Sequence, residues 1–285
     1  MLTIDTGAYC FRLESDLEHV KKMVTMMYGH QEDHNQIKPA DYKIRIKFDS
    51  FFRRFIKPQI SFYSDCHLPF KPMPANQAFP VLEWGMNWCI SAYDFNHLII
   101  HAAVIEKDGQ AIIFPATPGS GKSTLSAFMA LSGWNLFSDE MAIIDLNSNR
   151  VSPLYRPVCL KNESITLVKE WFPNAIFTPV AKDTHKGDVA HLKTQDFSCF
   201  NQLNKAEIKA IVFPKYARDQ DITIYQLNKS QGFSQLVQNA FNYNILGATA
   251  FDTVKKIIES SNQFEIIYNN LDDVSDLLIN DILAI

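Results

Sequence analysis

The stretch that most constrains this chain is IIFPATPGSGKSTL, residues 112–125, where a glycine-rich loop separates an apolar run from a helical pattern. The apolar run, residues 111–114, predicts a buried strand, and the residues from Lys122 onward predict a helix. A strand, a glycine loop, Lys-Ser and a helix form the context of a phosphate-binding loop. A chance glycine-rich turn is the competing interpretation, and the agreement of the motif with both flanking elements favours the phosphate loop.

Each residue type in this loop has a physical role in holding phosphate. Gly119 and Gly121 let backbone N–H groups face phosphate oxygens, and the following helix directs its positive dipole end to the same place. Lys122 is expected to reach the β- and γ-phosphates, and the Ser123 hydroxyl to ligate Mg2+. The first glycine of the usual motif is replaced by Ala116. The expected nucleotide contacts in the loop are Ala116, Thr117, Pro118, Gly119, Ser120, Gly121, Lys122, Ser123 and Thr124.

Length and composition bound the remaining possibilities. A chain of 285 residues, 47% apolar, is long enough for one large or two smaller domains with substantial cores. Its net charge of -4 gives no electrostatic case for nucleic acid or an anionic membrane as a partner. The five cysteines lack C-x-x-C spacing, and the N-terminus lacks a signal pattern, so we expect a soluble cytoplasmic protein with reduced thiols.

The first 95 residues carry no nucleotide motif, and they predict an α+β module that faces substrate or forms an oligomer. Hydrophobic periodicity predicts its helices and strands. Ser15 and Glu18 have the spacing of a capping box at the start of the first helix. The expected elements are a helix over 16–28, strands over 42–48 and 59–64, and a helix over 80–93.

Residues 96–285 are expected to form the domain that carries the phosphate loop. Strands over 98–105 and 110–114, joined at Asp108-Gly109, predict a hairpin that leads into the loop. The strand over 134–138 should run parallel to the 110–114 strand, because a helix connects them. Ligands bind beyond the carboxyl ends of such strands, so Asp139 and Glu140 should lie beside the phosphates. A hairpin is also expected over 141–154, and strands over 208–213, 222–227 and 264–268. The expected helices cover 162–171, 250–260 and 271–282, and one more begins at Ser230.

The acidic pair could divide two tasks between its members. Adjacent residues of an extended chain point to opposite sides. One carboxylate could therefore hold the metal while the other accepts a proton from a hydroxyl, as in phosphoryl transfer. A metal-binding acid with an exposed neighbour fits the same pattern, and the residues alone leave both interpretations open.

Three motifs together resemble the catalytic domain of HPr kinase/phosphorylase: His101-Ala102-Ala103-Val104, the phosphate loop, and Leu136 to Glu140. The chain is more closely similar to the group called HPr-kinase-related kinase A. The stretches that carry this resemblance lie between Phe70 and Asp252. They are PFKPMPANQAFPVLEWGMNWCI, LIIHAAVIEKDGQAIIFPATPGSGKSTL, GWNLFSDE, RPVCLKNESI, THKGDVAHL and AFNYNILGATAFD.

The resemblance implies an α/β P-loop kinase of the HPr kinase/phosphoenolpyruvate carboxykinase type, with a mixed sheet, ATP and Mg2+. Carried over to matching positions, Asp139 is the general base, Glu140 the acid near the metal, and Lys122 the phosphate lysine. Ser123 is the Mg2+ ligand, and His101 lies beside the active centre. A histidine in an apolar strand is otherwise most often a hydrogen-bonded core residue.

Two further cations, Arg156 and Lys186, could steady the transferring phosphate, and each could equally be an ordinary surface cation. The chain lacks the Glu-Arg-Gly signature loop that accompanies HPr recognition and dephosphorylation in HPr kinase/phosphorylases. The expected acceptor is therefore a hydroxyl of a peptide, of a protein Ser/Thr or of a small-molecule alcohol. A homo-oligomer is also expected, because HPr kinases assemble as hexamers.

The leading hypothesis is an ATP- and Mg2+-dependent kinase acting on a hydroxyl, with Asp139 as base. The alternative is a nucleotide-gated protein that binds a peptide or partner without phosphoryl transfer. A decarboxylating carboxykinase would require a His/Lys set for a second metal, and no such set is evident in the sequence.

Overall fold

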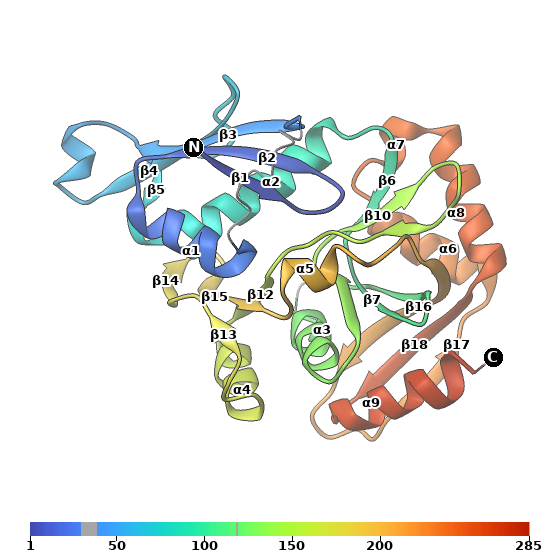
Figure 1. The fold of residues 1–285 in the computed structure, drawn as a ribbon. Coiled ribbons are helices and arrows are strands. Elements are labelled where there is room, and N and C mark those ends of the chain that lie inside the picture. Colours follow the sequence, from blue (N-terminus) through green and yellow to red (C-terminus); the bar gives the residue numbers. More distant parts are fainter. Residues whose placement is uncertain (30–38, 118, 285) are drawn as a thin grey trace. The chain divides into compact units, whose positions relative to one another are not determined.

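The computed structural model describes residues 1–29, 39–117 and 119–284, and the chain divides into two compact units, each mixing helices with strands (Figure 1). The first unit comprises Met1–Asp94 and Tyr155–Asn201, and the second Phe95–Leu154 and Gln202–Ile285. The break after Asp94 coincides with the predicted boundary near residue 95. Residues 155–201, which the prediction assigned to the second domain, group instead with the first unit. The chain is a mixed α/β protein.

The first unit contains a five-stranded mixed sheet with the order β1-β2-β3-β4-β5. β2 and β3 are parallel, and the other neighbours are antiparallel. In β3, Ile44 and Ile46 are buried while the residues between them face outward, which is the alternation that the sequence predicts. The strands are β1 (Leu2–Asp5), β2 (Cys10–Ser15), β3 (Tyr42–Phe48), β4 (Gln59–Ser64) and β5 (Met73–Pro74).

Two helices, α1 (Glu18–Tyr28) and α2 (Ala78–Tyr93), pack in this unit, and α2 contacts β3, β4 and β5. The predicted capping box at the start of α1 is wrong. Leu17 is the N-cap, and the Ser15 hydroxyl accepts the N–H of Leu17, so it does not reach the third residue of the helix. Short 3₁₀ turns lie at Phe52–Arg54 (η1) and Ala75–Gln77 (η2).

A second sheet of the first unit comes from the segment after Tyr155, and the sequence did not predict it. β15 pairs antiparallel with β12, β13 and β14. The predicted polar loop at Thr184–Gly187 is the turn between β14 and β15. Its elements are β12 (Val158–Lys161), α4 (Glu163–Trp171), β13 (Ile176–Phe177), β14 (Ala181–Thr184), β15 (Gly187–Lys193) and α5 (Phe197–Phe200).

The second unit is built on a six-stranded mixed sheet with the order β17-β18-β16-β8-β7-β9. β8 is parallel to β16 and antiparallel to β7, and β7 is antiparallel to β9. The predicted Asp108-Gly109 hairpin is confirmed, because both residues have positive φ between β7 and β8. The strands are β7 (Ala102–Lys107), β8 (Gln110–Pro115), β9 (Asn135–Ser138), β16 (Glu207–Tyr216), β17 (Thr223–Gln226) and β18 (Asn262–Tyr268).

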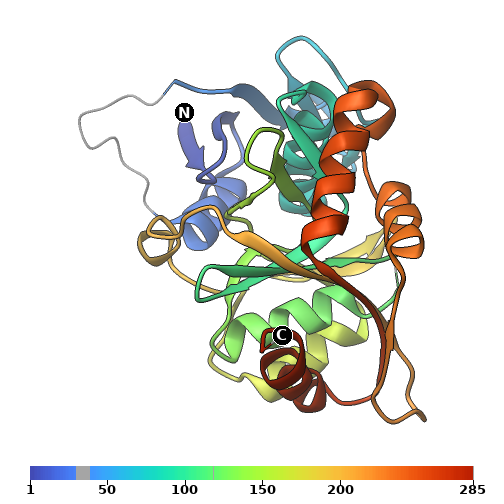
Figure 2. The same ribbon diagram turned by 90° about the vertical axis from the view of Figure 1, so that its right-hand side faces the viewer.

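Helices cover both faces of this sheet (Figure 2). α3 and α9 contact each other and the sheet on one face, and α6 and α8 pack together on the other. Asn228 caps α6 in a capping box with Gln231, so the predicted cap at Ser230 is wrong. No helix in the described ranges is both long and apolar enough to cross a membrane. The helices are α3 (Lys122–Leu131), α6 (Lys229–Gln238), α7 (Tyr243–Leu246), α8 (Ala248–Ser260) and α9 (Leu271–Leu277), which ends in a π-helical turn (Leu278–Ile282).

A small sheet, β11-β10-β6, completes the second unit. The single strand predicted over 98–105 is divided at His101, because β6 pairs with β10 in the small sheet whereas β7 belongs to the large one. The N–H of His101 donates to the carbonyl of Asn239 at 2.7 Å at this division. The strands are β6 (His97–Ile100), β10 (Ala142–Asp145) and β11 (Val151–Ser152).

Candidate functional site

The six-stranded sheet brings the glycine-rich loop after β8 and the acidic pair after β9 to one end of the sheet. β8 and β9 are both antiparallel to β7, so they run in the same direction, as the sequence predicts, but β7 lies between them. Pro115, the last residue of β8, pairs with Ala102, and Ser138, the last of β9, pairs with Val104. The loop after Pro115 and the acids after Ser138 therefore leave the sheet at neighbouring positions.

Asp139 is buried, and two side chains of α3 hold it in place. The Nζ of Lys122 donates to the Asp139 carbonyl oxygen at 2.7 Å, and the Oγ of Ser126 donates to its Oδ1 at 2.7 Å. Lys122 and Ser126 are four residues apart and so lie on the same face of the helix. The loop lysine thus has a direct hydrogen bond to the backbone carbonyl of the first acid, whose carboxylate is held by Ser126.

The loop itself has left-handed backbone at Gly119 and Gly121, with φ of 92° and 91°. A Cβ added at Gly121 would lie 2.8 Å from the Tyr268 hydroxyl, so this position is closed to side chains. A Cβ added at Gly119 would meet no atom within 4 Å. Gly121 is the N-cap of α3, and the first N–H groups of a helix have no partner within it.

Ser120 contributes a further polar group to this loop. Its carbonyl accepts the N–H of Tyr216 at 3.1 Å, which fixes the backbone, while its Oγ is buried without a hydrogen-bond partner among the described residues. The remaining predicted loop contacts differ in burial. Ala116 is buried, Thr117 is exposed, Ser123 and Thr124 are half-buried, and Pro118 lies outside the described residues.

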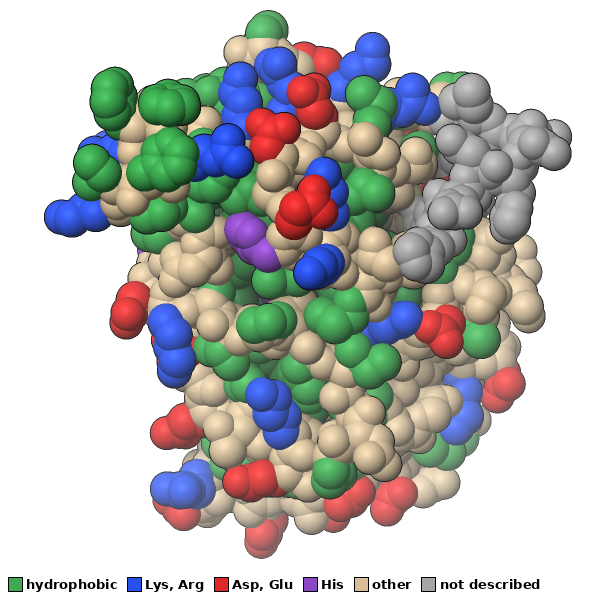
Figure 3. Space-filling view, turned by 60° about the vertical axis from the view of Figure 1, so that its left-hand side comes forward, with side chains coloured by type: hydrophobic (Ala, Val, Ile, Leu, Met, Phe, Trp, Pro, Cys, Tyr) green, Lys and Arg blue, Asp and Glu red, His purple; other side chains and the backbone are tan. Residues whose placement is uncertain are grey.

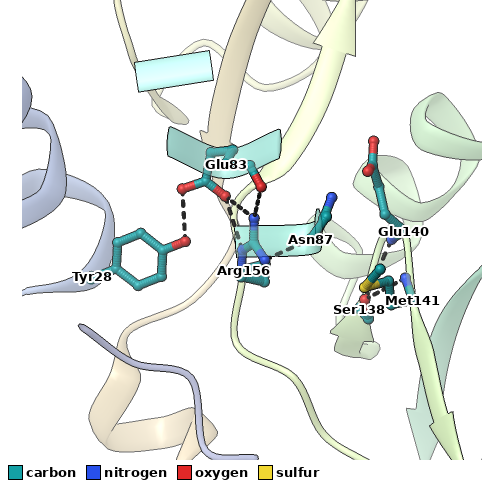
Figure 4. A network of polar contacts seen from close by, with 7 residues as sticks. All are labelled: Tyr28, Glu83, Asn87, Ser138, Glu140, Met141 and Arg156. Carbon is teal, nitrogen blue, oxygen red and sulfur yellow. Dashed lines mark hydrogen bonds and ion pairs between the residues drawn. The ribbon is translucent and has the colours of Figure 1, made fainter. Parts of the chain in front are cut away.

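Glu140 follows Asp139 and is half-buried. The Ser138 hydroxyl accepts the N–H groups of Glu140 and Met141 at 3.3 and 3.0 Å, which fixes the turn that presents the Glu140 side chain (Figure 4). The two acids thus have different surroundings, one enclosed against α3 and the other at a turn.

His101 contacts this turn from the division between β6 and β7. Its Nδ1 lies 3.1 Å from the Glu140 carbonyl oxygen, which can only accept, so Nδ1 carries the proton. Burial lowers the pKa of His101, and the nearby Lys122 ammonium lowers it further. The ring also meets Phe241 edge-on. The arrangement favours a neutral imidazole that fixes the backbone of the acidic pair.

Arg156, a predicted phosphate contact, lies in the first unit in a buried ion pair with Glu83 (Figure 4). Its Nε and Nη2 donate to the Glu83 Oε2 at 2.9 and 2.6 Å, and Nη1 donates to the Asn87 Oδ1 at 2.9 Å. The Tyr28 hydroxyl donates to the other Glu83 oxygen at 2.8 Å. The guanidinium is thus held in the first unit by Glu83 and Asn87.

Lys186, the other predicted cation, also belongs to the first unit. It is half-buried, with its Nζ 5.2 Å from the ring centroid of Trp84. The His185 ring meets the same indole edge-on, with 4.4 Å between the centroids. Lys186 is therefore placed by a cation–π contact.

Sequence reasoning missed Ser126 and Glu83 as partners of candidate residues. Ser126 could have been found, because a hydroxyl four residues after Lys122 must face the same side of the helix. Glu83 could not have been found from the sequence, because its partner Arg156 is 73 residues away in the chain. No His, Cys, Asp and Glu side chains form a group of three or more suited to a metal in the described parts of the chain.

No model of a protein family matches the chain, and no curated protein matches it.

Proposed function

We propose that this protein is an ATP- and Mg2+-dependent kinase that transfers the γ-phosphate to a hydroxyl of a peptide, a protein Ser/Thr or a small alcohol, with Asp139 as general base. The observation that carries the proposal is the 2.7 Å contact between the Lys122 Nζ and the Asp139 carbonyl. It joins the residue expected to hold phosphate to the residue expected to take the proton. The sequence resemblance to HPr-kinase-related kinase A, and with it a P-loop kinase fold of the HPr kinase type, supports the same activity.

The residues of the loop fit a bound triphosphate. The space beside Gly119 would admit phosphate oxygens close to the backbone, and the buried Ser120 hydroxyl offers a donor that lacks a partner in the described chain. The first N–H groups of α3 and the positive end of its dipole favour the same anion. When bound, MgATP would supply the transferable phosphoryl group and the metal that neutralises its charge.

The metal would be held by the Ser123 hydroxyl and the Glu140 carboxylate. Mg2+ in nucleotide sites usually takes only one or two protein ligands besides phosphate and water oxygens, so two side chains are enough. His101 would position Glu140, because its Nδ1–H donates to the Glu140 carbonyl. Its lowered pKa keeps the imidazole neutral near pH 7, which avoids a further cation beside Lys122.

Lys122 and Asp139 would act on the reacting groups. The Lys122 ammonium has three donors, so it can keep its bond to the Asp139 carbonyl while it contacts a phosphate oxygen. Ser126 orients the Asp139 carboxylate through Oδ1. Asp139 would accept the acceptor's hydroxyl proton as the oxygen attacks, which is the role of the catalytic-loop Asp in protein kinases.

The test is labelled-ATP transfer by the full chain, with cell extract as the source of acceptors, for the wild type and Asp139→Asn. Asn keeps the size of the side chain and an oxygen that can accept from Ser126. Transfer should therefore fall by about 10²–10⁴-fold, while ATP affinity measured by calorimetry stays within a few-fold of wild type. Unchanged transfer by Asp139→Asn would rule out the base assignment. ATP binding by the wild type without any labelled product would favour the nucleotide-gated alternative.

A further inference from the structure

The connection between β3 and β4 in the first unit exposes an unusual set of side chains. Four large apolar residues, Phe51, Phe52, Phe55 and Ile56, are each at least 67% exposed. The three cations Arg53, Arg54 and Lys57 are interleaved with them, and all three are exposed. We call residues 49–58 the hairpin tip. In Figure 1 this connection, drawn in light blue, extends past the ends of the strands.

The apolar side chains of the tip contact one another but remain exposed. Phe51 meets Phe52 and Phe55 edge-on, with 6.1 and 5.5 Å between ring centroids. Exposed apolar side chains that occur singly are common on proteins, whereas a contiguous group marks an interaction surface. Figure 3 shows hydrophobic side chains beside Lys and Arg side chains on this side of the first unit.

Part of the backbone of the tip is hydrogen-bonded within itself. Its 3₁₀ turn η1 pairs the N–H of Arg54 with the Phe51 carbonyl, and the N–H groups of Phe55 and Ile56 with the Phe52 carbonyl. These three bonds form a compact turn, which holds Phe51, Phe52 and Phe55 together at the surface.

Charge around the tip is strongly positive. Residues 42–64 contain six Lys and Arg residues against the single carboxylate of Asp49, in a chain whose net charge is -4. Asp49 accepts a hydrogen bond from Ser61, and the alternation of β3 places Lys43, Arg45 and Lys47 opposite its buried face. On the neighbouring strand β2, Glu14 lies in register with Arg45. The uncompensated positive charge is therefore that of the tip itself, Arg53, Arg54 and Lys57, while Asp41 and Asp65 lie at the other end of β3 and β4.

We propose that the hairpin tip docks the protein on an anionic lipid membrane, with its aromatic side chains in the headgroup region and its cations on lipid phosphates. Interleaved aromatic and basic side chains are typical of interfacial segments, whose cations keep their heads in water while the apolar parts insert. The headgroup region of an anionic membrane suits both kinds of side chain, because it offers phosphates to the cations and acyl chains to the aromatic rings. This docking is independent of the kinase activity proposed above.

The experiment is sedimentation of the full chain with vesicles of phosphatidylcholine alone or mixed with phosphatidylglycerol. The wild type should bind the anionic vesicles only, and more weakly as salt increases. Arg53→Gln/Arg54→Gln should weaken binding about 30-fold, since each cation near an anionic surface contributes about a fivefold factor. Phe52→Ser should weaken it at least about tenfold.

Matched changes in the second unit are the controls. Lys255→Gln/Lys256→Gln removes the same charge from an exposed face of α8, and Ile245→Ser removes a side chain that is 65% exposed on α7. Both controls should bind like the wild type, and unchanged circular dichroism should show that every variant is folded. The proposal would be overturned if the wild type did not bind vesicles, if it bound neutral and anionic vesicles equally, or if the tip variants bound as tightly as the wild type. A dimer in light scattering that Phe52→Ser dissociates, without vesicle binding, would instead assign the tip to an interface between copies of this chain.

Discussion

Replacing Glu83 by Gln should destabilise the first unit by about 3–5 kcal/mol, because the buried Arg156 guanidinium would lose its counter-charge. The side chains of Arg156 and Glu83 are only 7% and 5% exposed, so water cannot replace the carboxylate. Three of the hydrogen bonds in the network end on Glu83 side-chain oxygens: two from Arg156 and one from Tyr28. The free-energy cost of removing the guanidinium from water would remain, but the ion pair that offsets this cost in the wild type would be lost.

The assay is urea unfolding followed by tryptophan fluorescence. In a Trp134→Phe background the remaining tryptophans, Trp84, Trp88 and Trp171, all belong to the first unit, so the signal follows that unit. Glu18→Gln is the matched control, because it breaks an exposed pair with Lys21 in the same unit and should leave the urea midpoint close to that of the wild type.

A double variant tests the cause of this loss. Glu83→Gln/Arg156→Met also removes the unpaired cation, so it should be more stable than Glu83→Gln alone. If Glu83→Gln costs no more than Glu18→Gln, the pair is not buried as described. Arg156 would then again be a candidate for binding a ligand.

Three further predictions concern the second unit. Gly119→Ala and Gly133→Ala both place a side chain at positive φ with open space around the Cβ, so they should lose similar stability in thermal unfolding. Only Gly119→Ala should weaken ATP binding in calorimetry, and equal affinities would contradict the phosphate loop. Ser126→Ala removes a hydroxyl that donates to a buried carboxylate and should cost about 1.5–3 kcal/mol in urea unfolding; a loss under about 0.5 kcal/mol would contradict that contact. The Lys205 ammonium holds the pKa of Asp145 below its usual range, so this carboxylate contributes stability above about pH 4 that is lost as the pH falls towards its folded pKa. Asp145→Asn should therefore lose less stability than the wild type as the pH falls below about 4. The same loss in both proteins would contradict this ion pair.

The sequence predicted best what depends on neighbouring residues. The strand–loop–helix unit, the Asp108-Gly109 hairpin and the alternation of β3 follow from local propensity, and the structure has each of them. The side-chain caps were less predictable, because several short polar side chains near a helix start can accept its first N–H groups. At α6 the cap is Asn228, and near α1 the Ser15 hydroxyl accepts from Leu17 outside the helix.

Features that depend on distant pairing were missed. Residues 98–105 are apolar apart from His101, and the sequence does not show that the two halves pair in different sheets. The sheet around β15 has short strands without a clear period, and residues 155–201 pack with a unit that begins at the N-terminus. The total charge of -4 also averages over a basic hairpin between residues 42 and 64.

The most direct measurement of the central claim, that one phosphate site includes both the glycine loop and the acidic pair, is hydrogen exchange with and without MgATP. Peptides covering residues 116–125 and 138–141 should both exchange more slowly with nucleotide, and Lys122→Ala should abolish the change in both. Protection of the loop without the acids, or of neither, would contradict the account.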